Sequence, residues 1–212
     1  MVWIDPESSP HSTRSGVQHD KYTMAEFNIT VAPNESKIVP IIWLGDSDDK
    51  IVVNATLDQP GSSLKLLGIL FGTKHHLELK TNVIHVAKDT FSRTIIRGVI
   101  DGTASTNYEG MVKIQQGAKN TDTDLKAHMI LLSKTAHAKA IPRLDVSENE
   151  VKAGHGATVG RIDEEQLFYI MSRGLNLVQA KHIIVKGFLE SILFEFPMQE
   201  ANLVKNSLNL AS

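Results

Sequence analysis

The residues best suited to chemistry lie in a glycine-rich segment that contains Gly154, His155, Gly156 and Gly160. Neutral imidazole is a common ligand for iron and other transition metals. Glycine has no side chain that would bury a neighbouring histidine, and it lets other groups approach the backbone closely. The segment therefore makes His155 a candidate metal ligand, and the alternative is a structural or simply exposed histidine.

The other candidates for metal binding are weaker. His128 and His137 fall on neighbouring predicted strands, where exposed strand residues are the commoner explanation. His75 and His76 are adjacent, so in a strand their side chains point to opposite faces and do not form one chelating site. The acidic cluster at 46–49 follows a glycine and is more typical of a solvated turn.

Signatures of catalysis are missing from the sequence. It has no phosphate-binding loop, no dinucleotide loop and no nucleophile elbow. It also has no cysteine, which excludes disulfides and a thiolate nucleophile. Iron–sulfur clusters are held mainly by cysteine thiolates, so the chain alone is not expected to retain one. We expect a protein that is not an enzyme and has no tightly bound cofactor.

Composition narrows the class of protein further. The 212 residues carry a formal net charge of −2 and no dense run of Lys or Arg, which argues against nucleic-acid binding. No apolar run has the length needed to span a membrane. Residues 1–5 lack the basic start and apolar core of a signal peptide, so a cytoplasmic location is expected.

Short apolar, β-branched runs dominate the chain before the glycine-rich segment, and Gly, Asn or Asp residues separate them. Many short strands with turn signals indicate a sandwich, a barrel or a β-solenoid. Residue pattern alone slightly favours the sandwich, whereas the even spacing and the lack of strict alternation favour the solenoid. No clear sequence repeat decides between them. The runs are 38–44, 51–57, 64–71, 77–86, 94–100, 111–114 and 127–132.

The chain after the glycine-rich segment is predicted to be helical. Asp163 is a suitable N-cap, with Gln166 completing a capping box, for a first helix over 163–173 that Gly174 ends. A second helix is predicted over 176–196, because Pro197 breaks helices. Its apolar stripe comprises Val178, Ile184, Val185, Phe188, Leu189, Ile192 and Leu193. A short third helix would place Ala201, Val204 and Leu208 on one face.

Residues 155–175 read H-G-A-T-V-G-R-I-D-E-E-Q-L-F-Y-I-M-S-R-G-L. This segment resembles the SufB/SufD family of iron–sulfur cluster assembly proteins, as do 92–98, 116–118, 141–146 and 185–189. The resemblance implies a mainly β fold, a right-handed parallel β-helix with a C-terminal α-helical domain. Together with the residue pattern, it predicts an N-terminal arm (1–36), a β-helix core (37–160) and a helical domain (161–212).

The resemblance also implies roles for individual residues. SufD-like sequences commonly read C-S-H-G-A-T-V-G here, so His155 matches the histidine implicated in cluster assembly, while the cysteine is replaced by Ala153. SufB-like sequences read E-H-E-A-T, and their second glutamate would fall at Gly156. Their key cysteine would fall near Ala127. The chain is thus SufD-like, and an iron–sulfur cluster or iron would be held only transiently, within a complex.

The resemblance implies a scaffold and adaptor that couples a SufC-type ABC ATPase to cluster formation and pairs with a second SufB/SufD-type chain, as a homodimer or heterodimer. The ATPase is expected to dock on the second predicted helix. The expected contact residues are Ile184, Gly187, Phe188, Leu189 and Ile192. The alternatives are a carbohydrate-active β-helix enzyme and an ATPase-binding module without a cluster role.

Overall fold

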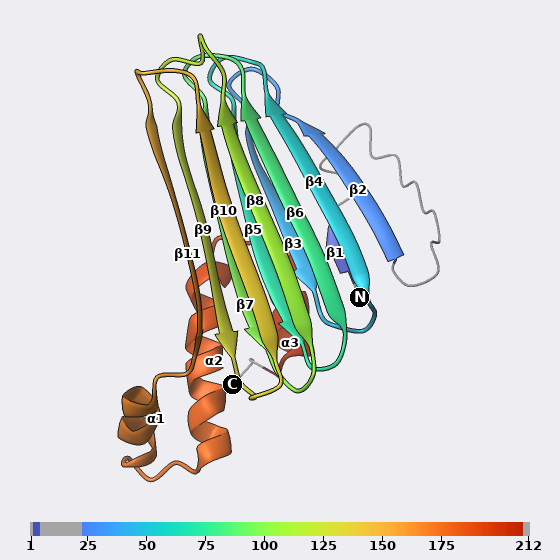
Figure 1. Ribbon diagram of the computed structural model, residues 1–212, viewed down its shortest axis with the longest axis vertical. Helices are drawn as coiled ribbons and strands as arrows, with labels where there is room; N and C mark the ends of the chain where they lie inside the picture. The colour runs from blue at the N-terminus through green and yellow to red at the C-terminus, as the bar shows by residue number, and fades with distance from the viewer. Residues whose placement is uncertain (1, 5–22, 210–212) are drawn as a thin grey trace.

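Successive strands of the chain alternate between two sheets, so that the backbone winds as a β-solenoid of about five turns. The computed structural model describes residues 2–4 and 23–209. One sheet has the strand order β1-β3-β5-β7-β9-β11, and we call it the odd sheet; the other, the even sheet, has the order β10-β8-β6-β4-β2. Figure 1 shows the two sheets stacked face to face.

The pairing within each sheet is parallel, apart from the antiparallel contact between β1 and β3. The strands are β1 (Val2–Ile4), β2 (Thr23–Thr30), β3 (Ser36–Trp43), β4 (Asp49–Leu57), β5 (Ser63–Gly72), β6 (His76–His85), β7 (Phe91–Ile100), β8 (Ser105–Ile114), β9 (Asp122–Leu131), β10 (His137–Val146) and β11 (Lys152–Arg161).

One row of corner residues repeats from turn to turn. Asn34, Gly61, Asp89 and Asn120 all have positive φ angles, a conformation that glycine, asparagine and aspartate adopt most readily. Asn120 Nδ2 donates to Asp89 Oδ1 at 2.8 Å, 31 residues away in sequence. The solenoid therefore does have a sequence repeat, but its signal lies in these corner residues and not in the apolar runs.

Side chains that point between the two sheets form the main core. In β4, every second residue is buried, and in-register partners on neighbouring turns face the same way. Trp43 and Tyr108 are the largest fully buried side chains. The indole Nε1 of Trp43 donates to Asp49 Oδ2 at 2.9 Å, so Asp49 is a buried acceptor and not part of a solvated turn.

A polar network lies inside the solenoid, at the corner between β6 and β7. The ring of His85 is completely buried, with Nδ1 2.8 Å from Thr90 Oγ1 and Nε2 2.8 Å from Ser92 Oγ. Two threonines on the next turn extend this network. Thr121 Oγ1 lies 3.0 Å from Thr90 Oγ1, and Thr123 Oγ1 lies 2.6 Å from Ser92 Oγ. A neutral imidazole offers one donor and one acceptor, and hydroxyls complement either. The network therefore suits neutral His85.

This burial predicts a dependence of stability on pH. Burial lowers the pKa of His85 to about 4, against about 6.5 in an unfolded chain. Between these two pH values the unfolded state binds more protons, so the free energy of unfolding falls as the pH falls. We expect a loss of about 3 kcal/mol from pH 7 to pH 4. Urea denaturation at a series of pH values measures it, and His85→Gln should flatten the curve. An equally steep decline in that variant would contradict the prediction.

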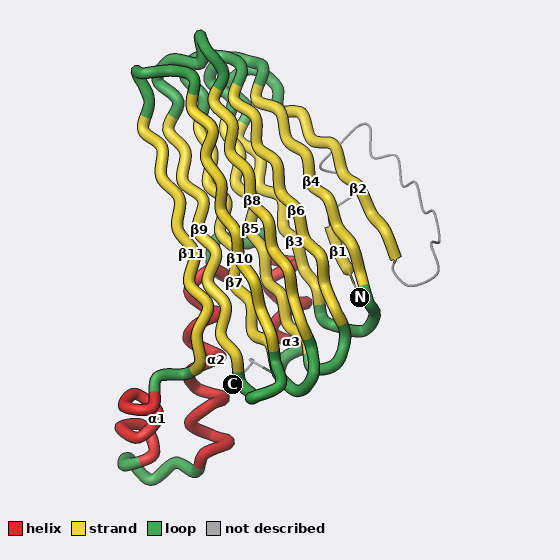
Figure 2. Tube along the Cα trace, viewed as in Figure 1, coloured by secondary structure: helices red, strands yellow, loops and turns green. Residues whose placement is uncertain are grey.

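Three helices follow the last strand: α1 (Glu164–Met171), α2 (Leu177–Leu193) and α3 (Met198–Ser207). The Asp163 side chain caps α1 by accepting from the backbone of Glu165 and Gln166. Asn176 and Gln179 form a capping box at the start of α2. α2 and α3 cover the outer face of the odd sheet, whereas α1 projects beyond the ends of the strands (Figure 2).

The expected mainly β solenoid with C-terminal helices is confirmed, and a sandwich is excluded because the pairing is parallel and in register. The division into three domains stays a prediction. Within the expected arm, residues 5–22 lie outside the described residues, while β2 pairs with β4. In the part of the chain that the structure describes, no helix is both long and apolar enough to cross a membrane.

Candidate functional site

The C-terminal end of the solenoid is open. β10 and β11 form the last turn, and among the described residues each pairs with a strand on one side alone, β8 and β9 respectively. Inner-row side chains that are buried in earlier turns are therefore partly or fully exposed here. The inner rows present mostly small and apolar residues: Ala138, Ala140, Pro142, Leu144 and Val146 from β10, and Ala153, His155, Ala157 and Val159 from β11.

His155 lies in the middle of the β11 inner row. It pairs in register with Leu125, which is fully buried in the core. The imidazole therefore lies on the inner face of the odd sheet, as Leu125 does. No further turn covers it, and His155 is exposed. The glycine-rich segment thus forms a regular edge strand that pairs with β9 over its whole length.

The position that matches the SufB-type cysteine also belongs to this site. Ala127 on β9 is fully buried, and its in-register partner is Ala157 on β11, two residues from His155. The position therefore lies one turn inside the open end. Gly156, which replaces the SufB-type glutamate, lies on the opposite, outer face of β11 in register with Lys126. Neither residue supplies a ligand atom from its side chain.

The chemistry available at the open end is that of one exposed imidazole among apolar neighbours. Among residues 2–4 and 23–209, no group of three or more His, Asp or Glu side chains is arranged to hold a metal ion. The described residues therefore offer a metal or cluster at His155 no further cluster of side-chain ligands. This geometry suits a shared site at an interface better than a self-contained metal centre.

The two other histidine pairs that the sequence suggested do not form chelating sites. His128 lies on the outer face of the odd sheet, whereas His137 lies on β10 in the even sheet. The rings of His75 and His76 have separate partners: His75 Nδ1 lies 3.2 Å from Asp48 Oδ1, and His76 Nδ1 lies 2.7 Å from Ser105 Oγ. A backbone hydrogen bond from His76 is the main cause that lowers the pKa of Asp48.

The apolar stripe of α2 packs against the solenoid. Leu189 and Ile192 are buried together with Leu67 and Val99 of the odd sheet, and Ile184 is also buried. Phe188 is half-buried, with the Arg97 guanidinium 4.8 Å from its ring centre. Gly187 is exposed and has no atom within 4 Å of the point where a Cβ would lie. The role of these residues in binding a partner stays a prediction, but most of them are core residues of the isolated chain.

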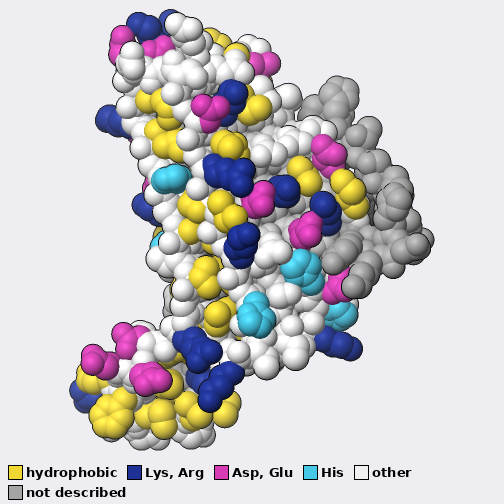
Figure 3. All heavy atoms as spheres, viewed as in Figure 1, with side chains coloured by type: hydrophobic (Ala, Val, Ile, Leu, Met, Phe, Trp, Pro, Cys, Tyr) yellow, Lys and Arg dark blue, Asp and Glu magenta, His cyan; other side chains and the backbone are white. Residues whose placement is uncertain are grey.

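A different apolar surface is free on the same helices. Phe168 and Val178 are 74% and 77% exposed, and α1 buries none of its residues. Figure 3 shows hydrophobic side chains gathered on the lobe that α1 forms with the start of α2, with acidic side chains on one flank and basic ones on another. We call this surface the lobe patch: Phe168, Tyr169, Met171, Leu177 and Val178. Exposed apolar patches of this kind mark interaction sites.

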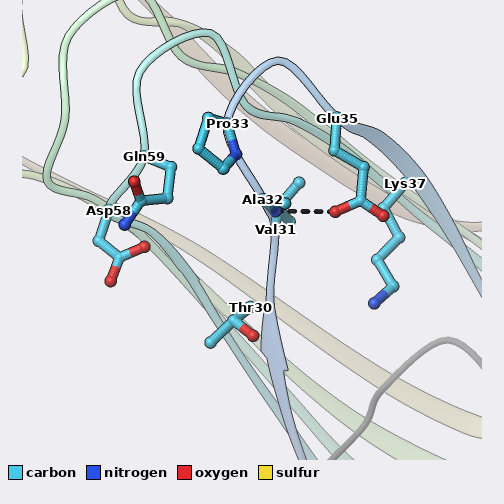
Figure 4. Close-up of a pocket in the computed structure, with 8 residues that line it drawn as sticks. All are labelled: Thr30, Val31, Ala32, Pro33, Glu35, Lys37, Asp58 and Gln59. Atoms are coloured by element: carbon cyan, nitrogen blue, oxygen red, sulfur yellow. Dashed lines mark hydrogen bonds between the residues drawn. The ribbon is translucent and has the colours of Figure 1, made fainter.

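A pocket of about 460 Å³ lies at the other end of the solenoid, between the β2–β3 and β4–β5 corners (Figure 4). Glu35 lines it and accepts a hydrogen bond from the backbone of Ala32 at 2.7 Å. Lys37, Asp58 and Gln59 supply the other long polar side chains. The pocket has no histidine and lies on the first turn, whereas His155 lies on the last.

Comparison with known proteins places these features in a family. Residues 11–188 match a family described as the SufBD core domain of SUF system FeS cluster assembly. The chain is 32% identical to the iron–sulfur cluster assembly protein SufD of Bacillus subtilis over 167 residues, which cover 78% of this chain and 38% of that protein. It is 34% identical over 138 residues to an iron–sulfur cluster assembly SufBD family protein of Mycobacterium tuberculosis, covering 65% of this chain and 16% of that one. A SufBD family protein of Antithamnion sp. is 34% identical over 130 residues, which cover 61% of this chain and 44% of that protein. The chain spans less than half the length of each of these relatives.

Proposed function

Because the chain belongs to the SufB/SufD family of SUF-system iron–sulfur cluster assembly proteins, we propose that it is a SufD-like scaffold and adaptor subunit, with no turnover of its own. Iron and sulfide are its cargo. The observation that carries this proposal is the position of His155 on the inner row of an open solenoid end. An exposed imidazole at that place can share a metal with a second molecule.

The second molecule is a SufB/SufD-type chain that docks end to end on β10 and β11. Two features support this pairing. The last turn exposes a mostly apolar inner surface, and the free edges of β10 and β11 have backbone groups available for pairing with another strand. Because this chain has no cysteine, a heterodimer with a cysteine-bearing partner supplies the thiolates that clusters prefer. A homodimer would offer histidine alone.

The lobe patch is the proposed docking surface for a SufC-type ABC ATPase. It is exposed and apolar, and α1 joins β11 through just Ile162 and Asp163. A displacement of α1 by the ATPase would act directly on the strand that carries His155. The stripe that the sequence predicted as the docking surface, Ile184 to Ile192, stabilises the position of α2. Its buried members anchor this helix to the odd sheet.

Two other functions compete with this proposal. An ATPase-binding module without a cluster role is favoured by the absence of cysteine. A carbohydrate-active enzyme would need a pair of carboxylates in a groove, but Asp48 and Asp49 are engaged by the backbone of His76 and the indole of Trp43. The experiment below separates the scaffold from the binding module.

We expect His155→Ala to lower the yield of cluster in the reconstituted complex at least about tenfold, since even indirect partners of a metal ligand are worth that much. The full chain, a cysteine-bearing SufB-type protein and a SufC-type ATPase are incubated anaerobically with iron and sulfide, and visible absorption is recorded. The chain by itself should remain colourless.

His76→Ala is the matched control, because His76 is hydrogen-bonded to Ser105 in the even sheet, away from the open end. It should leave the yield unchanged. An undiminished yield with His155→Ala would reduce the chain to an ATPase-binding module. A stoichiometric chromophore on the isolated chain would also contradict the proposal.

A further inference from the structure

The outer face of the odd sheet is covered unevenly. α2 and α3 pack on residues of β3, β5 and β7, such as Ile42, Leu67 and Val99. Beyond them, β9 and β11 continue the same face. At one level of the sheet, Arg97 of β7, His128 of β9 and Thr158 of β11 stand side by side in register. This row begins under α2 and ends on the uncovered strands.

Arg97 is a partly buried cation with no counter-charge among residues 2–4 and 23–209. Its guanidinium lies over the Phe188 ring of α2 at 4.8 Å, and its Nε is buried without a hydrogen-bond partner. Within the described part of the chain, no carboxylate forms an ion pair with it. Desolvation lowers the pKa of Arg97, although a guanidinium remains charged. A desolvated donor without an acceptor is costly, and an anion would relieve that cost.

Two more side chains of β9, His128 and Lys126, lie near Arg97 on this face. His128 Nδ1 lies 2.7 Å from Thr158 Oγ1, so the hydroxyl of β11 fixes the orientation of the ring. Lys126 lies two residues away on the same face, and its Nζ lies 2.7 Å from Asp124 Oδ2. Burial lowers the pKa of His128, and the charges of Arg97 and Lys126 lower it further. The ring therefore lies in a positive local field.

The neighbouring strand leaves room for a ligand. Gly156 is the in-register partner of Lys126, and a Cβ built on it would meet no atom within 4 Å. Gly154, on the same face, would meet nothing closer than Asp124 Oδ1 at 3.1 Å. The outer face of β11 is therefore bare beside Lys126. A small ligand can lie against the backbone there and reach the side chains of β9.

We propose that Arg97, Lys126 and His128 form a binding site for a small oxyanion, of carboxylate or phosphate type, on the outer face of β9 and β11. Arginine suits the planar, two-oxygen edge of either group, and lysine adds a point charge. The Thr158 hydroxyl and the stacked Phe188 ring keep His128 and Arg97 in place. This site is independent of the proposed cluster function, because it uses the opposite face of the strand from His155.

The test uses the full chain with inorganic phosphate and acetate as separate probes. The His128 ring signals are followed by nuclear magnetic resonance, and sodium chloride keeps the ionic strength constant. A bound anion should raise the pKa of His128, and binding should strengthen as the pH falls. We expect Arg97→Gln and Lys126→Gln each to weaken binding about tenfold, the effect of losing one charge-assisted contact. Arg143→Gln is the matched control, since Arg143 is exposed on the even sheet.

The outcomes are distinct. Saturable shifts with both probes, lost in Arg97→Gln and Lys126→Gln but kept in Arg143→Gln, support the site. Shifts with phosphate alone assign it to tetrahedral oxyanions, and shifts with acetate alone assign it to carboxylates. No shift in the unmodified chain, or equal shifts in all variants, overturns the proposal. Circular dichroism verifies that each variant is folded, and the Lys126 variant keeps the test valid if Arg97→Gln unfolds.

Discussion

Phe168→Asp is expected to weaken the binding of a SufC-type ATPase at least tenfold while the chain stays folded. Phe168 is 74% exposed on α1, which buries none of its own residues, so the fold loses little when this side chain changes. Burying one large apolar side chain contributes about 1.5–3 kcal/mol, and a buried unpaired carboxylate would add a penalty. Titration calorimetry with the purified ATPase measures the affinity.

Two further variants make this test specific. Phe194→Asp changes an equally exposed residue, at the other end of α2, and should leave the affinity unchanged. Leu189→Asp places a carboxylate at a fully buried position between α2 and the odd sheet, so it should destabilise the fold by at least about 3 kcal/mol. Normal binding by the Phe168 variant would remove the lobe patch from the interface. A folded Leu189 variant that has lost binding would instead restore the α2 stripe as the docking surface.

Val159→Asp is expected to prevent end-to-end pairing with a second SufB/SufD-type chain. Val159 lies on the inner row of β11 and is 41% exposed at the open end, so a carboxylate is tolerated in the free chain. In the pair it would lie in a mostly apolar interface, and a buried charge without a partner costs several kcal/mol. We expect the dissociation constant to rise at least about a hundredfold, as measured by sedimentation.

Val86→Asp is the matched control for the pairing test, because Val86 is exposed at the β6–β7 corner, away from the open end. It should pair normally. If Val159→Asp also pairs normally, the open end is not the interface. If both variants fail to pair, the loss is not specific to the open end, and the assignment of β10 and β11 is again contradicted.

Local signals in the sequence determined the helical part of the protein and its family. Asp163 caps α1 as predicted, because an N-cap is satisfied by backbone groups within the next three residues. The predicted capping box is not completed, because the Asp163 side chain accepts from the Gln166 backbone but the Gln166 side chain forms no bond back to Asp163. Gly174 adopts a positive φ after the first helix, as expected of a C-terminal stop. The motif around His155 is likewise contiguous, so the family could be identified without any tertiary contact.

The sequence also located most of the earlier strands but understated the later ones. The run at 127–132 is the apolar part of β9, which extends from Asp122 to Leu131. β10 was predicted just through the strand at His137, and β11 was not predicted as a strand, because their inner rows are mostly small residues and three glycines of β11 face outward. Pairing with β8 and β9 gives them their extended conformation, and no property of the segments alone reveals that pairing.

Burial was decided by tertiary structure alone. An amphipathic stripe specifies that a helix has an apolar face, but not whether a sheet or a partner covers it, and here the odd sheet covers Leu189 and Ile192. The same holds for His85 and Arg97, whose neighbours come from turns and helices distant in sequence. His155 was identified from its glycine-rich surroundings, but its exposure at an open solenoid end follows from the absence of a turn beyond β11 among the described residues, which is a property of the winding and not of the motif.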